Sequence, residues 1–205
     1  MAEVSLIYRN IWLYRRFMNI LYTSGYKQRF KKVINVIDYY KPKSLLELCF
    51  GDVFIANYCK SKNIKWTGID MNDHFVEHAK RKDFNATCAD LLSFSELPKA
   101  DVCVMIGSLY HFHKDTHTLL FKMLQASDTI IISEPVKNLS DKNNLAGRIA
   151  KRSANAGKGD EQFRFNEITL KQLLESEAKK LNFNFKIVDS YKKDCIITIK
   201  KNGTN

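Results

Sequence analysis

The chain has 205 residues, of which 45% are hydrophobic and 27% are charged, as in a typical globular domain that buries a core. Its formal net charge of +11 excludes a strongly acidic protein and is compatible with an anionic partner. No apolar run reaches the 18 residues of a membrane span, and arginines interrupt the first hydrophobic segment. We therefore expect neither a transmembrane helix nor a signal peptide.

The excess positive charge lies in two segments. Residues 1–43 hold nine Lys or Arg and two acidic residues, and residues 137–165 hold seven and three. Either both are solvated basic faces or both meet an anionic partner, and the sequence leaves the two alternatives open. The five cysteines show no CxxC spacing and no cluster with histidine, which predicts a reduced, cytoplasmic protein without a metal site.

Hydrophobic spacing predicts a helix over residues 4–23 and a second over 25–40, which ends before Pro42. Strands and helices then alternate. The predicted strands are 44–49, 64–70, 85–88, 101–106 and 128–133, and the predicted helices are 52–61, 72–80 and 115–126. This alternation predicts an α/β fold with a doubly wound, mostly parallel sheet and helices on both faces.

Residues 137–165 interrupt the alternation because they are polar, basic and contain glycine, and we interpret them as an inserted loop or short helices. A helix at 167–181 and strands at 183–190 and 194–200 follow. No helix separates the last two strands, so we expect an antiparallel hairpin at or near one edge of a seven-stranded sheet. The predicted organisation is a single domain over residues 1–205, with 1–43 as a helical cap and 137–165 as a basic insert over the active site.

The most informative segment is the strand and turn from Ser44 to Asp52, followed by a second strand that ends at Asp70. An acid at the end of the second strand, about 20 residues past a glycine turn, is typical of folds that bind the ribose of an adenosine cofactor. The turn has neither GxGxxG nor GxxxxGK[ST], which argues against NAD, FAD and nucleoside triphosphates. An adenosine cofactor without phosphate fits better.

These motifs resemble those of class I S-adenosylmethionine-dependent methyltransferases. Leu46 to Asp52 is similar to the first motif of that family, Gly68-Ile69-Asp70 to the second and Ala89-Asp90-Leu91 to the third. Two longer segments are similar to the family's fourth and fifth strands, Asp101 to Phe112 and Ile130 to Pro135. The resemblance covers about residues 25–200 in order and spacing. Each motif is weak alone, and the series of five is specific.

The resemblance implies a Rossmann-like methyltransferase fold, S-adenosyl-L-methionine as cofactor and S-adenosyl-L-homocysteine as product. It implies that Glu47 orients the turn and the methionine amino group, that Asp70 binds the ribose and that Asp90 binds the adenine. The whole implied cofactor set is Glu47, Cys49, Gly51, Asp70, Met71, Asp90, Leu91, Ile106 and Gly107. Cys49 and Val53 replace two of the family's three glycines, which puts cofactor affinity in question.

Each of these assignments has a structural alternative. Asp70 could cap the helix over 72–80, as could Asn72 or Asp73. Asp90 could begin a turn, and Gly107 could only end a strand.

The catalytic candidates follow the fourth and fifth strands. His111 is the first choice for a base or acceptor-orienting group, with Tyr110 beside it, and Glu134 is the second. Alternatively, His111 could cap a helix or pack in the core, and Glu134 could pair with a basic residue of the insert. The substrate-binding candidates are Tyr22, Tyr26, His113 and Arg164, with Arg164 as an anion clamp. Some of the N-terminal tyrosines (Tyr8, Tyr14, Tyr22 and Tyr26) could cover the methionine end of the cofactor, or they could be core packing.

The expected function is methyl transfer by in-line displacement to a small acceptor that is anionic or carried on a phosphate, on oxygen or nitrogen. One alternative is an RNA methyltransferase, which the pI of about 9.4 permits, although the sequence has no separate RNA-binding domain and no Asn-Pro-Pro-Tyr motif. The other is a non-catalytic, methyltransferase-like binding subunit, which the altered glycine turn motivates. The acceptor, a monomeric or homodimeric state, and contact of helix 4–23 with a membrane surface stay open.

Overall fold

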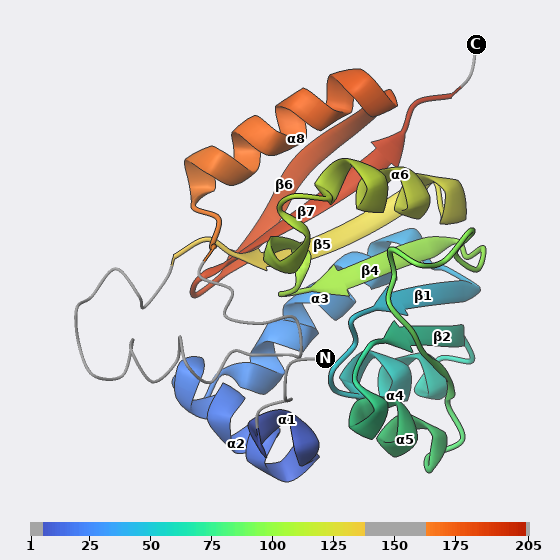
Figure 1. Cartoon of the computed structure of the whole chain (residues 1–205), viewed down its shortest axis with the longest axis vertical. Coiled ribbons are helices and arrows are strands. Elements are labelled where there is room, and N and C mark those ends of the chain that lie inside the picture. Colours follow the sequence, from blue (N-terminus) through green and yellow to red (C-terminus); the bar gives the residue numbers. More distant parts are fainter. Residues whose placement is uncertain (1–5, 138–162, 204–205) are drawn as a thin grey trace.

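The computed structural model describes residues 6–137 and 163–203, which form a seven-stranded sheet (Figure 1). The strand order is β3-β2-β1-β4-β5-β7-β6. Strand β7 pairs antiparallel with both β5 and β6, and the other neighbouring strands pair in parallel. The strands are β1 (Ser44–Leu48), β2 (Lys65–Asp70), β3 (Asn85–Cys88), β4 (Val102–Ile106), β5 (Thr129–Pro135), β6 (Phe183–Tyr191) and β7 (Asp194–Lys201). The predicted parallel sheet with a C-terminal antiparallel hairpin is confirmed.

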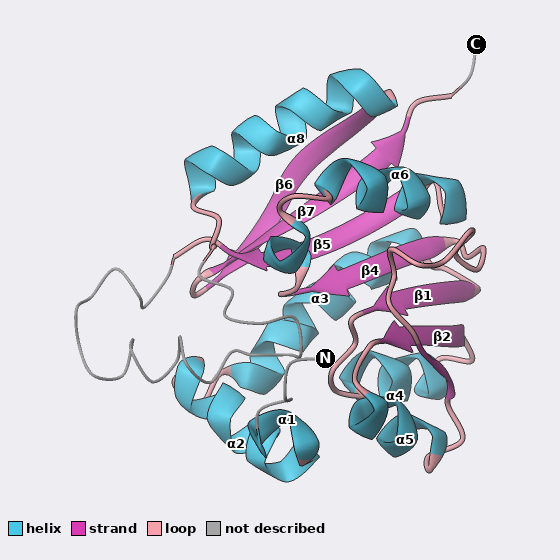
Figure 2. Cartoon of the chain, viewed as in Figure 1, coloured by secondary structure: helices cyan, strands magenta, loops and turns pink. Residues whose placement is uncertain are grey.

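Helices cover both faces of the sheet (Figures 1 and 2). One face packs on α3 (Tyr26–Tyr40), α4 (Phe54–Ser61) and α5 (Asp73–Lys80), and the other on α6 (Thr116–Ala126) and α8 (Glu167–Leu181). Side chains alternate along each strand, so Leu45 and Val104 enter the first core while Leu46 and Met105 enter the second. Every residue of β4 is buried, as expected for a central parallel strand.

The largest difference from the predicted elements lies at the N-terminus, where the helix expected over 4–23 is two helices. These are α1 (Leu6–Arg9) and α2 (Ile11–Leu21). Asn10 separates them because its backbone is extended and its Oδ1 accepts hydrogen bonds from the Trp12 and Leu13 amides, at 2.9 and 3.4 Å. A side chain that caps a new helix competes with continuation of the old one, and the spacing of apolar residues does not reveal that competition.

The other predicted helices and strands agree with the structure within two residues at each end. A short 3-10 helix, η1 (Leu109–Phe112), was not predicted. The expected basic insert over 137–165 lies outside the described residues except for Lys137 and residues 163–165.

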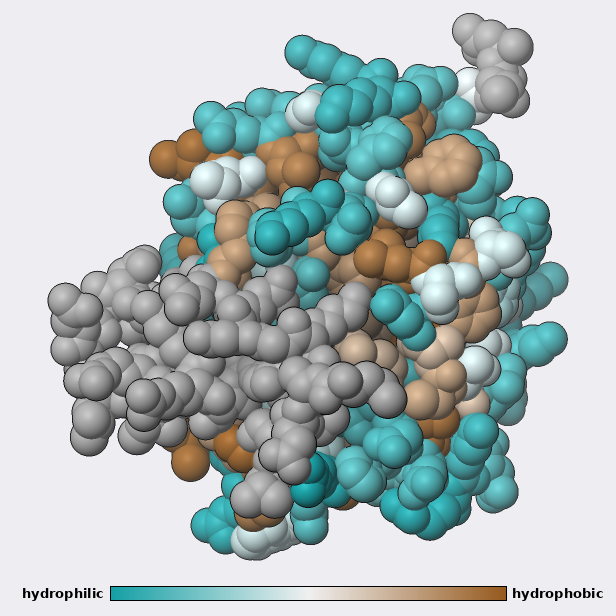
Figure 3. Space-filling model, in the orientation of Figure 1, coloured by the Kyte–Doolittle hydropathy of each residue, from teal (hydrophilic) through white to brown (hydrophobic). Residues whose placement is uncertain are grey.

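Hydrophilic residues cover much of the face seen in Figure 3, with hydrophobic residues in small separate patches. None of the helices within residues 6–137 and 163–203 is both long and apolar enough to cross a membrane. Helix α2 packs Tyr14, Met18 and Leu21 against the core and exposes Trp12 and Ile20. Packing on the domain therefore accounts for one side of this helix, and contact of its other side with a membrane surface stays a prediction.

The helical cap is fixed to the strand ends by polar contacts. The Arg15 guanidinium donates to both carboxylate oxygens of the buried Asp52, at 2.8 and 2.7 Å. The Asn72 side-chain amide donates to the Tyr8 carbonyl at 2.9 Å. Because Asp52 follows β1 and Asn72 follows β2, these contacts place α1 and α2 over the ends of both strands.

Replacement of Arg15 by methionine should loosen this cap. Among the described residues, the Val53 amide would be the one donor left to the buried Asp52 carboxylate. Loss of a charged hydrogen-bond partner costs about 2 kcal/mol. Chemical denaturation should show that loss of stability, and hydrogen exchange should quicken over residues 11–21. The matched control is Arg16→Met, because the Arg16 side chain lies over the ring of the exposed Trp12; equal effects of the two substitutions would contradict the assignment.

Candidate active site

The turn after β1 is tied to the end of β2. The Cys49 amide donates to the Ile69 carbonyl at 2.7 Å, and the Gly51 amide donates to Asp70 Oδ2 at 2.9 Å. Cys49 and Gly51 both have left-handed backbones, with φ of +52° and +56°. Glycine adopts this conformation freely, whereas a residue with a Cβ is strained there. The backbone at position 49 thus favours glycine, which the resembled family has there, over the cysteine of this chain.

Glu47 is fully buried in β1. Its Oε2 accepts a hydrogen bond from the Trp66 indole at 2.8 Å, while its Oε1 has no hydrogen-bond partner among the described residues. Burial raises the pKa of Glu47 well above its usual range; the indole bond opposes this shift, and the charges of Asp52 and Asp70 add to it. A buried acceptor without a donor is costly, so Oε1 marks a place where a ligand N–H would be stabilising.

Asp70 ends β2 and is 6% exposed. Its two oxygens accept the Gly51 and Asn72 amides, each at 2.9 Å, and each oxygen keeps a lone pair for a further donor. Burial raises the pKa of Asp70 to about 6 against the effect of these backbone donors. The cap of α5 is Asn72, whose Oδ1 accepts the His74 amide at 3.0 Å, so the alternative of Asp70 as helix cap is wrong.

The neighbouring cofactor candidates lie along the same edge. Met71 follows Asp70 and is 37% exposed. Asp90 is exposed in the turn after β3, where its Oδ1 accepts the Leu92 amide at 3.1 Å, and Leu91 is buried. Asp90 therefore stabilises this turn through the Leu92 amide, and its contact with adenine stays a prediction.

Gly107 follows Ile106 at the end of β4 and also has a left-handed backbone, with φ of +69°. Its amide donates to the Ser133 carbonyl of β5 at 2.6 Å. A Cβ at this position would overlap Nη2 of Arg29, so glycine is needed both for the backbone and for the close approach of that guanidinium.

Arg29 belongs to a buried network that sequence reasoning missed. Its Nε donates to Asp194 at the start of β7, and Asp194 also accepts the Tyr22 hydroxyl at 2.8 Å and the Ser133 hydroxyl at 3.1 Å. The available signal was the position of Arg29 on the same face of α3 as the buried Tyr26 and Phe30. A basic residue on an apolar face is expected to have a buried partner.

Glu134 is fully buried at the end of β5. Its two oxygens accept the Leu109 and Tyr110 amides, at 3.0 and 3.2 Å, so the carboxyl group holds the first turn of η1. Burial raises its pKa to about 8, opposed first by the Leu109 amide. No described basic side chain forms an ion pair with it in the structure, and its contacts suit a residue that positions η1.

The other acceptor-side candidates gather around η1. The ring of Tyr110 contacts the ring of His111, with centroids 3.9 Å apart, and the guanidinium carbon of Arg164 lies 3.9 Å from the Tyr110 ring centroid. His113 stacks on Phe163 with centroids 4.2 Å apart. The structure thus brings four of the candidates, Tyr110, His111, His113 and Arg164, to one place beyond β4.

The N-terminal tyrosines divide into two groups. Tyr22 and Tyr26 are 2% and 1% exposed and pack in the core with Phe30, so we do not assign them a role in binding the acceptor. Tyr14 instead lies over the glycine turn, with its hydroxyl 3.1 Å from the position a Cβ would take on Gly51. It is the tyrosine best placed to cover the methionine end of a cofactor.

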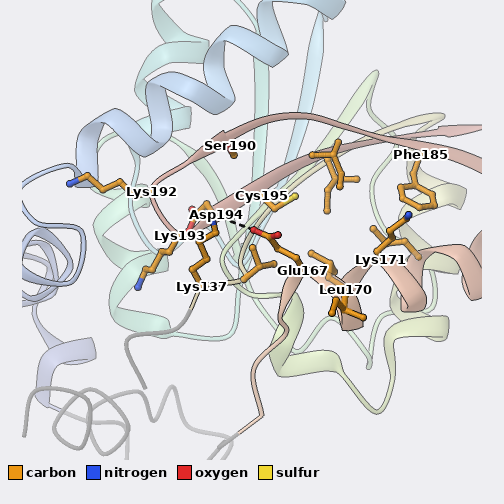
Figure 4. A pocket seen from close by; sticks show the side chains of 15 residues that line it. Lys137, Glu167, Leu170, Lys171, Phe185, Ser190, Lys192, Lys193, Asp194 and Cys195 are labelled. Carbon is orange, nitrogen blue, oxygen red and sulfur yellow. Dashed lines mark ion pairs between the residues drawn. The ribbon is translucent and has the colours of Figure 1, made fainter. Parts of the chain in front are cut away.

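A cavity of about 410 Å³ lies between α8 and the hairpin of β6 and β7. Figure 4 shows Lys137, Lys192 and Lys193 at one end and Phe185 at the other. Asp194 lines this cavity and also anchors Arg29, so the cavity borders the network beyond β4. Burial lowers the pKa of Lys193 to about 8, with Asp194 opposing this and Arg29 and Arg164 adding to it.

Replacing Cys49 by glycine should stabilise the protein, because a left-handed residue with a Cβ costs about 1 to 2 kcal/mol and the greater freedom of unfolded glycine offsets part of that gain. The matched control is Cys88→Gly in β3, which lacks a left-handed backbone and should be destabilised. Urea denaturation of both variants measures the difference. If Cys49→Gly lost as much stability as the control, the backbone of Cys49 would not be strained.

A scan against protein-family models and a search of curated proteins found no match to this chain. Solved structures do match it. The methyltransferase domain of bacterial CtHen1-C has a TM-score of 0.68 at 16% identity, over 86% of this chain and 98% of that one. The plantazolicin methyltransferase BpumL in complex with SAH has a TM-score of 0.68 at 17% identity, over 96% of both chains.

Human N-acetylserotonin methyltransferase in complex with SAM has a TM-score of 0.66 at 18% identity, over 96% of this chain and 58% of that one. The glycine turn, the acid at the end of β2 and the order of all seven strands occur together here. This chain has the fold of the class I S-adenosylmethionine-dependent methyltransferases.

Proposed function

We propose that this protein transfers a methyl group from S-adenosylmethionine to a small anionic acceptor. The observation that carries the proposal is the hydrogen bond from the Gly51 amide to Asp70. It joins the glycine turn and the ribose-binding acid into one site at the carboxyl ends of β1 and β2, where α/β folds bind nucleosides.

The residues at this edge fit the cofactor. Asp70 has lone pairs for the ribose hydroxyls. Glu47 Oε1, which has no partner in the part of the chain that the structure describes, would accept an N–H from the methionine amino group. Cys49 replaces a family glycine, but its backbone has the conformation that glycine would adopt. The altered sequence of the turn therefore preserves its geometry, which supports retained binding over a binding subunit that has lost the cofactor.

The bound cofactor supplies a methyl group on a positively charged sulfur. A lone pair on the acceptor oxygen or nitrogen forms the new bond to that carbon while the carbon–sulfur electron pair stays on sulfur. We assign His111 as the group that takes the acceptor proton, since it lies beyond β4 on the ring of Tyr110. Both carboxylate oxygens of Glu134 accept hydrogen bonds from backbone amides of η1, so we assign Glu134 to positioning that turn.

Two half-buried cations support an anionic acceptor. Arg164 lies over the Tyr110 ring. Burial lowers the pKa of Lys193, Asp194 opposes this shift, and repulsion by Arg29 and Arg164 adds to it. An anion placed among these groups relieves that repulsion. Recessed cations suit a small carboxylate or phosphate better than a long nucleic-acid backbone, which is bound mainly by exposed basic side chains.

Isothermal titration should show that the protein binds S-adenosylhomocysteine, more weakly as the pH falls through about 6. Protonation of Asp70 removes the charge that strengthens its bonds to the ribose. Asp70→Asn should bind about tenfold more weakly, which corresponds to about 1.4 kcal/mol, and should lose the pH dependence. The control is Asp73→Asn at an exposed acid of α5. Absence of binding by the unmodified protein would overturn the proposal.

The acceptor class is tested with labelled S-adenosylmethionine and a panel of hydroxyl and amino compounds with and without a carboxylate or phosphate. We expect transfer to the anionic members, with KM rising above pH 8 as Lys193 loses its proton. Arg164→Gln should raise KM with little change in kcat, whereas the exposed Arg81→Gln should change neither. Transfer only to neutral acceptors, or only to RNA, would contradict this assignment.

A further inference from the structure

Arg29 is buried with one end of its guanidinium unsatisfied. The side chain is 4% exposed, and its Nε pairs with Asp194. Its Nη2 has no hydrogen-bond partner among the described residues. Burial alone would lower the pKa of Arg29, but the Asp194 charge and then the neighbouring tyrosines raise it above its usual range. The group is therefore a permanent buried cation with free N–H donors.

The free end of Arg29 faces the ends of the central strands. Nη2 lies against the backbone of Gly107, directly after β4. Strand β4 pairs with β1, whose glycine turn lies under Tyr14. The free donor therefore lies at the edge where the glycine turn and the end of β4 meet.

A second buried atom that has no partner within residues 6–137 and 163–203 occurs on the same face of the sheet. Glu47 pairs with Val104, three residues before Gly107, and its Oε1 is unsatisfied. One atom is a donor on a cation and the other an acceptor on a carboxyl group. A donor on a cation and an acceptor on a carboxyl group are the chemical types that pair with the α-carboxylate and the α-amino group of an amino acid.

We propose that Arg29 binds the α-carboxylate of the cofactor's methionine moiety. This assignment rests on the proposed function, because S-adenosylmethionine is the ligand that brings an amino-acid end to this edge. Asp194 is the positioning residue: its contacts with Arg29, Tyr22 and Ser133 fix Nε and leave Nη2 directed at the strand ends. The C-terminal hairpin thereby takes part in cofactor binding without touching the cofactor.

The test compares S-adenosylhomocysteine with its decarboxylated analogue, which keeps the adenosine, the sulfur and the amino group. Titration calorimetry on the unmodified protein should show tighter binding of S-adenosylhomocysteine by tenfold or more. Arg29→Lys keeps a positive charge near Asp194 but removes Nη2. This variant should bind S-adenosylhomocysteine at least tenfold more weakly and the decarboxylated analogue with unchanged affinity, so that the preference disappears.

Two further variants separate this contact from a general loss of structure. Gly107→Ala keeps Arg29 itself but puts a Cβ where Nη2 now lies, which moves the guanidinium away from the end of β4. This variant should also bind S-adenosylhomocysteine more weakly while its affinity for the decarboxylated analogue is unchanged. Asp70→Asn removes the charge of the acid assigned to the ribose, so it should lower the affinity for both ligands by the same factor. Thermal melting identifies any variant that fails to fold, in which case Gly107→Ala decides the question.

The outcomes distinguish this assignment from the proposed function. Binding of neither ligand by the unmodified protein would overturn both. Equal binding of the two ligands, or equal weakening of both in Arg29→Lys and Gly107→Ala, would overturn only the role of Arg29. Unchanged S-adenosylhomocysteine affinity in Arg29→Lys with a raised acceptor KM would overturn it in favour of a carboxylate on the acceptor.

Discussion

The buried carboxylate of Asp194 is the constraint on which the site depends. It accepts hydrogen bonds from Arg29 of α3, Tyr22 of the cap and Ser133 of β5, groups that lie far apart in the chain. A buried charge is stable only when it is paired and hydrogen-bonded, so these elements must close around it together. Their closure sets Arg29 against Gly107, and this contact in turn requires the absence of a side chain at the end of β4.

A second set of polar contacts closes the other side of the site. Asp70 holds the glycine turn, and Arg15 holds the cap to Asp52 directly after that turn. The strained backbone of Cys49 lies between them. The turn therefore keeps its shape through bonds from neighbouring strands and helices, which explains how it can hold the conformation of a glycine-rich turn with one glycine.

Local spacing made most of the fold predictable, because apolar residues alternate in strands and recur every three or four residues in helices. Glu47 and Asp70 could be selected because an acid inside or directly after an apolar strand is unusual. The function of Glu134 could not be derived, since its partners are backbone amides about 25 positions earlier in the chain. The break at Asn10 depends on a side-chain cap that competes with an otherwise continuous helical pattern.

Arg29 shows where sequence reasoning ends. Its position on the buried face of α3 is visible in the spacing, but its partner is Asp194, 165 residues later, and its free end is directed at a glycine of a third element. The pairing of non-local charges depends on the order of strands in the sheet, and only the three-dimensional structure supplies it. The same holds for the N-terminal tyrosines. Their spacing assigns all of them to the cap, whereas the structure shows Tyr14 over the glycine turn and Tyr22 and Tyr26 in the core.

A crystal structure of the protein with S-adenosylhomocysteine bound is the most direct test of this account. We expect the ribose hydroxyls to bind Asp70, the amino group to lie near Glu47 and the carboxylate to lie within hydrogen-bonding distance of Arg29 Nη2. Density for the ligand away from the ends of β1, β2 and β4, or a carboxylate directed away from Arg29, would contradict it.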